Sequence, residues 1–147
     1  MEVYRIHHGR YDPLDGVGAA LVGGRWNPLG VPMVYASTAY EGALLEQLVH
    51  SGIGRLPGAR VASRIFIPQE WGVPALNLEE HPDWTEDVRS REIGEAWASS
   101  NGSLALLVPS FVARPWGWNV LINPRHPAFA TIVVLEVAEI TWDPRVV

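Results

Sequence analysis

The chain has 147 residues, of which 48% are hydrophobic and 18% charged, as expected of one globular domain over residues 1–147. It has no cysteine, which excludes disulfides, thiolate nucleophiles and cysteine-based zinc sites. The formal net charge of -5 argues against a nucleic-acid binder, and no signal peptide or membrane span is evident, so we expect a cytoplasmic protein.

The first elements of the chain are short. Residues 2–8 predict a strand, with Val3 and Ile6 in the core. A connection rich in glycine and proline, with a short apolar insert, follows over residues 10–30. Residues 31–37, with β-branched and aromatic side chains, predict a second strand.

The clearest helix is predicted over residues 37–52. Thr38 precedes Glu41 by three positions, the pattern of a capping box, and Gly52 is a stop signal. An apolar stripe at helical spacing predicts the buried face, and it consists of Leu44, Leu45, Leu48 and Val49.

The second half of the chain predicts more strand than helix. The expected elements are a strand over 59–69, a loop over 71–84, a helix over 85–102 ending at Asn101-Gly102, a strand over 103–110, a loop over 111–129 and a strand over 130–142. Two helices among several strands indicate an α+β fold, a compact single domain with a mixed or antiparallel central sheet.

Glu46 lies on the shoulder of the buried helix face, about 130° from the centre of the apolar stripe. Helical side chains lean over the preceding turn, where Gly42 leaves room at a cost of about 0.8–1 kcal/mol relative to alanine. Glu46 is therefore either an ordinary solvated glutamate or a group that faces a ligand.

Arg25 stands among residues that restrict the backbone, in the stretch "GGRWNPLG". A guanidinium can donate two parallel hydrogen bonds to phosphate, and flanking glycines let backbone approach a ligand closely. The alternative is a surface arginine beside a packed tryptophan. The stretch is neither a Walker loop nor a dinucleotide-binding fingerprint.

Other polar candidates stand at strand ends and in one loop. Tyr35 could stack on a ring or belong to the core, and Ser110 could face a ligand or simply form a turn. Asn119, Asn123 and His126 could supply hydrogen bonds, although Asn-Pro is also an ordinary turn former. The five histidines show no metal-binding pattern, so no metal is expected.

Five stretches in order resemble the RES domain family: "VYRIH", "GGRWNPLGVPMVYAS", "ALLEQLVH", "LVPS" and "NVLINPRHPAF". Arg25, Glu46 and Ser110 match the arginine, glutamate and serine that give the family its name, and Tyr35 matches its tyrosine. The resemblance implies a fold similar to that of ADP-ribosyltransferase toxins. It also implies the toxin of a type II toxin–antitoxin pair, which takes NAD as a substrate and not as a cofactor.

The resemblance also implies partners and residue roles. The expected partner is an antitoxin with an Xre-like DNA-binding part and a C-terminal segment that covers the toxin's site, in a complex that could contain a toxin homodimer. Cleavage of the nicotinamide–ribose bond passes through a transition state like an oxocarbenium ion. The implied roles are charge stabilisation for Glu46, pyrophosphate binding for Arg25, framing of the ribose for Tyr35, orientation of Glu46 or substrate for Ser110, and further substrate contacts for Arg5, Asn119 and Asn123.

Three other functions remain open at this point. An ADP-ribosyltransferase with a protein target would use the same residues and differ only in the acceptor. A non-catalytic protein-binding module is motivated by the seven tryptophans, because aromatic residues concentrate at interfaces. A ribonuclease toxin is disfavoured by the net charge of -5 and the absence of a clear histidine pair.

Overall fold

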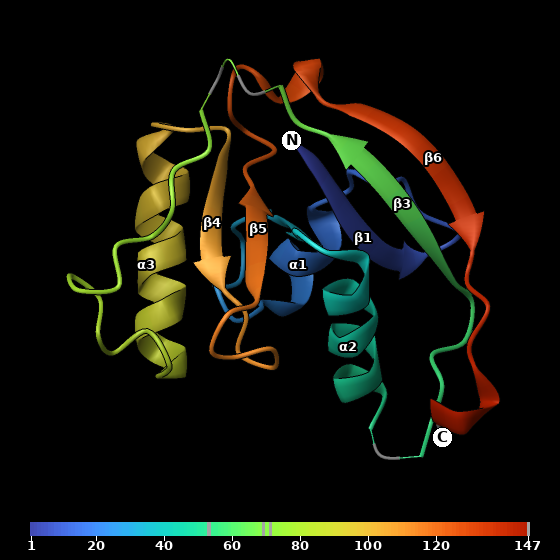
Figure 1. The fold of residues 1–147 in the computed structure, drawn as a ribbon. Coiled ribbons are helices and arrows are strands. Elements are labelled where there is room, and N and C mark those ends of the chain that lie inside the picture. The colour runs from blue at the N-terminus through green and yellow to red at the C-terminus, as the bar shows by residue number, and fades with distance from the viewer. Residues whose placement is uncertain (53, 69, 71, 147) are drawn as a thin grey trace.

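A computed structural model describes residues 1–52, 54–68, 70 and 72–146. This part of the chain forms one sheet of six antiparallel strands with three α-helices (Figure 1). The expected α+β class is thus confirmed, with an antiparallel sheet. Gln69 and Trp71, at the expected end of the third strand and the start of the loop after it, lie outside the described residues.

The strand order is β4-β5-β2-β1-β3-β6, so the N-terminal strand lies inside the sheet. The strands are β1 (Glu2–His8), β2 (Val34–Ser37), β3 (Arg60–Phe66), β4 (Ala105–Pro109), β5 (Trp118–Ile122) and β6 (Val133–Glu139). β1 and β2 pair in the middle, where Tyr4 lies opposite Ser37. β1 precedes the loop that contains Arg25, and β2 precedes the helix that contains Glu46. Their pairing therefore brings these two segments close together.

β5 is the main departure from the sequence-based expectation, which placed these residues inside a loop over 111–129. The strand pairs with β2 on one side and with β4 on the other. Val120, Leu121 and Ile122 are fully buried, so both faces of the strand are covered. Its apolar run is too short to show a period, and the surrounding turn-forming residues conceal it.

Two hydrophobic clusters hold the fold together. The first includes Val3 and Ile65 beneath the middle of the sheet. The second joins the sheet to α3 (Asp87–Ser100) through Trp26 and Trp84, whose rings stack with centroids 6.0 Å apart. Val3 and Ile6 are both buried, as predicted.

The helices differ from the predictions mainly at their starts. The apolar insert in the connection over 10–30 is a helix, α1 (Val17–Val22), where no helix was predicted. α2 (Tyr40–Ser51) has Ala39 as its N-cap, and the predicted capping box is wrong because the Thr38 hydroxyl donates to the carbonyl of Trp118 instead. Gly52 ends α2 and Asn101 ends α3, both with positive φ, as expected.

The predicted buried face of α2 is also partly wrong. Ala43 is its buried residue, whereas Leu45 and Val49 are exposed. Ala43 is thus the buried residue of α2, and Glu46, three positions later on the same helix, lines a cavity. Two short 3₁₀ helices, Phe129–Thr131 and Pro144–Val146, flank β6. No helix of the described residues is long and apolar enough to cross a membrane.

Candidate active site

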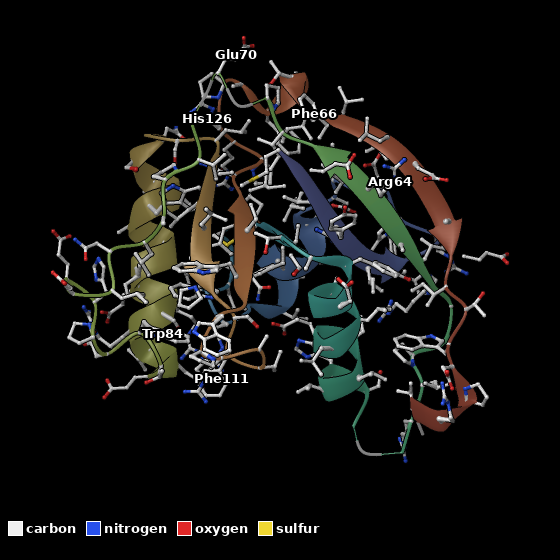
Figure 2. All side chains as sticks on the ribbon, in the orientation of Figure 1. Arg64, Phe66, Glu70, Trp84, Phe111 and His126 are labelled. Carbon is white, nitrogen blue, oxygen red and sulfur yellow. The ribbon has the colours of Figure 1, made fainter. Side chains whose placement is uncertain are left out.

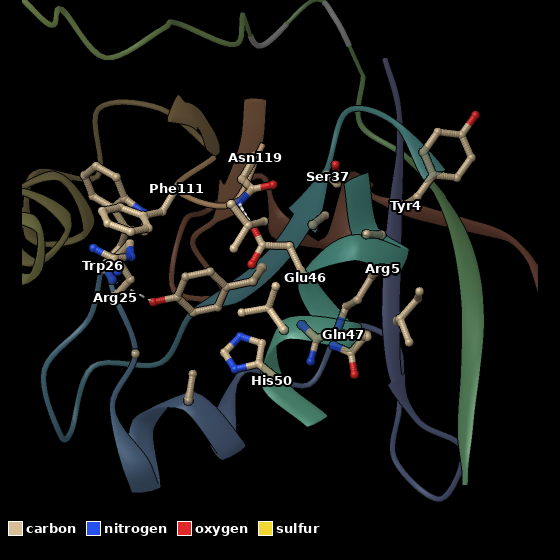
Figure 3. A pocket seen from close by; sticks show the side chains of 18 of the residues that line it. Tyr4, Arg5, Arg25, Trp26, Ser37, Glu46, Gln47, His50, Phe111 and Asn119 are labelled. Carbon is tan, nitrogen blue, oxygen red and sulfur yellow. Dashed lines mark hydrogen bonds between the residues drawn. The ribbon is translucent and has the colours of Figure 1, made fainter. Parts of the chain in front are cut away.

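A cavity of about 560 Å³ lies between α2, the strands β1 and β2, and the loop of residues 23–27, which we call the arginine loop (Figure 3). Its size is typical of sites for small molecules and cofactors. Five of the seven predicted site residues line it: Arg5, Arg25, Tyr35, Glu46 and Asn119. They come from separate segments of the chain, and the central strands bring them together.

Glu46 projects from α2 into the cavity with its carboxylate held in one orientation. Its Oε1 accepts a hydrogen bond of 2.8 Å from the Asn119 amide (Figure 3) and another of 3.0 Å from the Ser110 hydroxyl. Among the described residues, Oε2 has no hydrogen-bond partner. Two neutral donors thus fix the carboxylate without neutralising its charge, and one oxygen remains available to a ligand.

Ser110 acts on Glu46 from outside the cavity. It follows β4 directly, is 3% exposed and does not line the cavity. Its hydroxyl oxygen also accepts a hydrogen bond of 3.1 Å from the backbone N–H of Ala113. Of the two roles expected for Ser110, this placement favours the orientation of Glu46.

Gly42 was expected to leave room for a ligand near Glu46, but the Ser37 hydroxyl occupies this space. A Cβ atom at Gly42 would lie 2.6 Å from the Ser37 hydroxyl oxygen. The glycine therefore permits close approach of α2 to β2. That approach places the helix that carries Glu46 against the central sheet.

Arg25 is held by α3 and by an aromatic ring. The Ser90 hydroxyl donates to the Arg25 carbonyl at 2.7 Å, and the guanidinium Nη1 lies 3.3 Å from the Asp87 carboxylate as an ion pair. The Arg25 guanidinium carbon lies 4.0 Å from the centroid of the Phe111 ring, a cation–π contact. The Arg114 guanidinium makes a second such contact with Phe111.

Phe111 belongs to the cavity wall although the sequence analysis did not identify it. Its ring packs edge-on against Trp84, with centroids 6.0 Å apart (Figure 2). Trp84 in turn belongs to the buried cluster beside α3. The hydrophobic core thus fixes the ring against which the Arg25 guanidinium rests.

Arg5 brings a second guanidinium to the cavity from β1. Its Nη2 donates to the Asp15 carbonyl at 3.3 Å, while Nε and Nη1 are buried and have no hydrogen-bond partner in the described part of the chain. Burial lowers the pKa of Arg5, opposed by the carboxylates of Asp15 and Asp12, yet an arginine stays protonated at neutral pH. Arg5 lines the cavity and therefore brings a positive charge to its wall, which suits an anionic ligand.

Tyr35 lines the cavity, but its hydroxyl group is bound to protein. The hydroxyl donates to Oδ1 of Asn27 at 2.6 Å and accepts from the backbone N–H of Trp26 at 3.1 Å. Burial is the largest cause that raises the pKa of Tyr35, so the phenol is neutral. Asn27 was not among the site residues predicted from the sequence.

Asn123 lies away from the cavity, contrary to its predicted role as a substrate contact. It is 1% exposed, and its amide donates to the Ala98 carbonyl at 3.0 Å and to Oδ1 of Asn101 at 2.9 Å. These bonds stabilise the C-terminal end of α3, and Asn123 is therefore not part of the candidate site. His126 also serves a turn, where its Nδ1 accepts from the N–H of Ala128.

Two polar residues on α2, Gln47 and His50, also line the cavity and were missed. His50 follows Glu46 by four positions, so the helical period alone could have placed both on one side of α2. Within the described residues, no group of three or more histidine, aspartate or glutamate side chains is arranged to hold a metal ion.

Residues 2–143 match the family model described as RES domain. A protein of Sphingobium sp. (strain YBL2) named "Prs ADP-ribosylating toxin" is 38% identical over 144 residues, covering 92% of this chain and 88% of the relative. "Toxin Res" of Photorhabdus laumondii subsp. laumondii is 37% identical over 135 residues, covering 88% of this chain and 85% of that protein.

A solved structure has the same fold. The chain is similar to one in the crystal structure of the M. tuberculosis MbcT-MbcA toxin-antitoxin complex, with a TM-score of 0.71 over 95% of this chain and 84% of that chain. Sequence identity between the two is 18%, so this likeness concerns the fold alone.

Proposed function

The chain belongs to the RES domain family, and on that premise we propose that it is the toxin of a toxin–antitoxin pair and consumes NAD by cleaving the nicotinamide–ribose bond. The match to the family model covers residues 2–143, nearly the whole chain. The name of the Sphingobium relative supports NAD as substrate, because ADP-ribosylation takes its ADP-ribose group from NAD. The expected cytoplasmic location remains part of the proposal.

The observation that carries the proposal is the pairing of a fixed carboxylate with two guanidinium groups in one cavity. Glu46 is oriented by Ser110 and Asn119, and Figure 3 shows it between Arg25 and Arg5. NAD presents the matching chemistry, since it carries a negatively charged pyrophosphate and a ribose that becomes positively charged as the glycosidic bond breaks. The two guanidiniums would hold the pyrophosphate and thereby orient the ribose.

The mechanism needs little acid catalysis. The bond between the ribose C1′ and the nicotinamide nitrogen breaks, both electrons leave with the nitrogen, and nicotinamide departs as a neutral molecule. C1′ acquires oxocarbenium character, which the free Oε2 of Glu46 would stabilise directly or through a ribose hydroxyl. An acceptor oxygen or nitrogen then bonds to C1′ and releases its proton.

The acceptor defines the principal alternative. With water the enzyme is an NAD glycohydrolase, and with inorganic phosphate it is a phosphorylase. With a protein side chain it is an ADP-ribosyltransferase, an alternative favoured by the name of the Sphingobium relative. Incubation of the protein with adenylate-labelled NAD and a cell extract separates these outcomes, because only the transferase places the label on a macromolecule.

The non-catalytic binding module loses much of its motivation. Trp26 and Trp84 are buried in the core, and among the described tryptophans Trp116 is the prominently exposed one, at 86%. Aromatic residues that build the core do not form an interaction surface. Trp26 and Trp84 therefore serve the packed fold and give no support to a docking site.

An antitoxin is the proposed partner. The solved toxin–antitoxin complex with the same fold supports a protein that binds the toxin, while the Xre-like character and any toxin homodimer rest on the family resemblance. Expression of the chain should arrest growth, and co-expression of the product of an adjacent gene with an Xre-like part should restore it. Continued arrest in the presence of that product would contradict the proposed partner.

Release of nicotinamide from NAD by the purified protein tests the proposed reaction. Glu46→Gln should lower kcat by about 100-fold or more, since the amide keeps the shape but lacks the charge that the transition state requires. Glu41→Gln on the same helix is the matched control, because Glu41 is exposed and does not line the cavity. Equal activity of the Glu46→Gln variant and the wild type would refute the catalytic assignment.

A further inference from the structure

Asn27 lies at the C-terminal end of the arginine loop and is fully buried. Its amide nitrogen is within hydrogen-bond distance of three backbone carbonyls: those of Ala19 at 2.8 Å, Val31 at 3.0 Å and Pro28 at 3.1 Å. Its own carbonyl accepts from the N–H of Gly24 at 2.9 Å. One side chain thus connects α1, the arginine loop and the approach to β2.

These contacts determine which way the amide points. Carbonyl oxygens only accept hydrogen bonds, so the atom that faces three of them must be the NH₂ group of Asn27. The opposite atom, Oδ1, is an acceptor, and it lies 2.6 Å from the Tyr35 hydroxyl. The Tyr35 hydroxyl must therefore donate its only proton to Asn27.

The acceptor side of the same hydroxyl is also used. It accepts a hydrogen bond of 3.1 Å from the backbone N–H of Trp26, the residue that directly follows Arg25 in the chain. A Cβ atom at Gly24 would lie 2.7 Å from the Tyr35 hydroxyl and 2.8 Å from Oδ1 of Asn27, so only glycine allows this approach. The backbone of the arginine loop therefore packs directly against Tyr35 and Asn27.

We propose that Asn27 is a positioning residue, which binds the hydroxyl proton of Tyr35 and thereby fixes the arginine loop, so that Tyr35 contributes its ring and not a proton to the reaction. The Trp26 N–H donates to the Tyr35 hydroxyl, and the Gly24 N–H donates to the Asn27 carbonyl. Both neighbours of Arg25 in the chain are therefore fixed by Tyr35 and Asn27. The role in catalysis rests on the proposed NAD chemistry, whereas the coupling between the two side chains does not.

Kinetics with Tyr35→Phe and Asn27→Ala test the proposal. Each variant should raise KM for NAD by about tenfold or more, because Arg25 loses its fixed position, while kcat falls less and its pH profile keeps its shape. Tyr40→Phe is the matched control, since Tyr40 also loses a hydroxyl and lies outside the cavity lining. A Tyr35→Phe variant with an unchanged KM, a kcat lowered about 100-fold and an altered pH profile would overturn the proposal and assign the hydroxyl to proton transfer.

A double-mutant cycle on unfolding separates this inference from the proposed function. The double variant should lose less stability to urea than the sum of the losses in the two single variants, because both single changes break the same bond between Tyr35 and Asn27. Additive effects would overturn the coupling even if NAD cleavage is intact. If the wild type releases no nicotinamide, the proposed function fails while the cycle still tests the pair. If Asn27→Ala does not fold, Tyr35→Phe alone gives the kinetic result.

Discussion

Glu46 shows how a catalytic candidate depends on groups distant in sequence. The hydrogen bonds from Ser110 and Asn119 span 64 and 73 positions of the chain. The helical period and Gly42 drew attention to Glu46, but they could not identify its donors. Ser110 was a candidate from its place at a strand end, the resemblance to the family gave it a role, and the structure favours orientation of Glu46 as that role.

Replacement of Ser110 should impair catalysis without removing a substrate contact. Ser110→Ala removes one of two bonds to the Glu46 carboxylate, and such a bond to a charged group contributes about 1.5–3 kcal/mol. We expect kcat to fall by about 10–100-fold with KM for NAD nearly unchanged, as steady-state kinetics would measure. Ser99→Ala, at an exposed position on α3, is the control. A large rise in KM with kcat preserved would indicate that Ser110 contacts the substrate.

Two residues of the site, Asn27 and Phe111, could not be recognised from the sequence. Asn27 belongs to the stretch that suggested Arg25, yet an asparagine before a proline is also an ordinary turn former. Phe111 stands in a loop rich in aromatic residues, and nothing local indicates that a guanidinium rests on its ring. Both roles arise from contacts with other segments.

At the scale of elements, close approach between α2 and β2 is the feature that shapes the site. Gly42 allows the Ser37 hydroxyl to lie against the helix, and that hydroxyl also accepts from the N–H of Ala39. α3 approaches the arginine loop even more closely, since a Cβ atom at Gly94 would lie 1.7 Å from the Trp26 carbonyl oxygen. Two glycines inside helices therefore serve packing of the cavity walls.

Gly42→Ala should destabilise the protein although alanine is the better helix former. The gain in helix propensity is about 1 kcal/mol. The Ser37 hydroxyl, 2.6 Å from the new Cβ atom, would have to rotate away and lose the bond from the Ala39 N–H, and overpacking of this kind costs about 1–3 kcal/mol. In a Ser37→Ala background the overlapping atom is gone, and the same Gly42→Ala change should become neutral or stabilising in urea unfolding.

Gly18→Ala provides the control for this pair. Gly18 lies in α1, and a Cβ atom there meets nothing within 4 Å. That substitution should stabilise the protein by up to about 1 kcal/mol. The same destabilisation by Gly42→Ala with and without Ser37 would show that the overlap is not its cause.

At the scale of the whole molecule, a buried histidine links stability to pH. Nε2 of His7 lies 2.7 Å from the Ser63 hydroxyl oxygen, and Nδ1 donates to the His8 carbonyl at 3.0 Å. The second bond fixes the proton on Nδ1, so Nε2 of the neutral ring accepts from Ser63. Burial is the largest cause that lowers the pKa of His7, Arg5 acts in the same direction, and the His8 carbonyl opposes them.

Stability should therefore fall as the pH drops below about 6.5, the pKa of an unperturbed histidine. The folded pKa lies below the unfolded value, so between the two values the unfolded chain binds more protons and acid favours unfolding. Urea unfolding between about pH 5 and 7 should show this slope, and His7→Gln should reduce it. His8→Gln, with a less buried ring on the same strand, should leave it in place. An unchanged slope in His7→Gln would contradict the assignment.

By their local pattern alone, Arg25 and Glu46 stayed open between an ordinary surface role and a ligand-facing one. The sequence by itself determined the local elements: β1 and its core residues, and α2 and α3 with their C-terminal ends. These follow from periodicity and turn chemistry, which act over a few neighbouring residues. Only the tertiary structure decided that β5 lies inside the sheet, that Asn123 secures α3, and that the Tyr35 hydroxyl is bound to Asn27. Such features depend on which segments pack together, and the partners of a buried polar group lie wherever packing brings a donor or acceptor within about 3 Å.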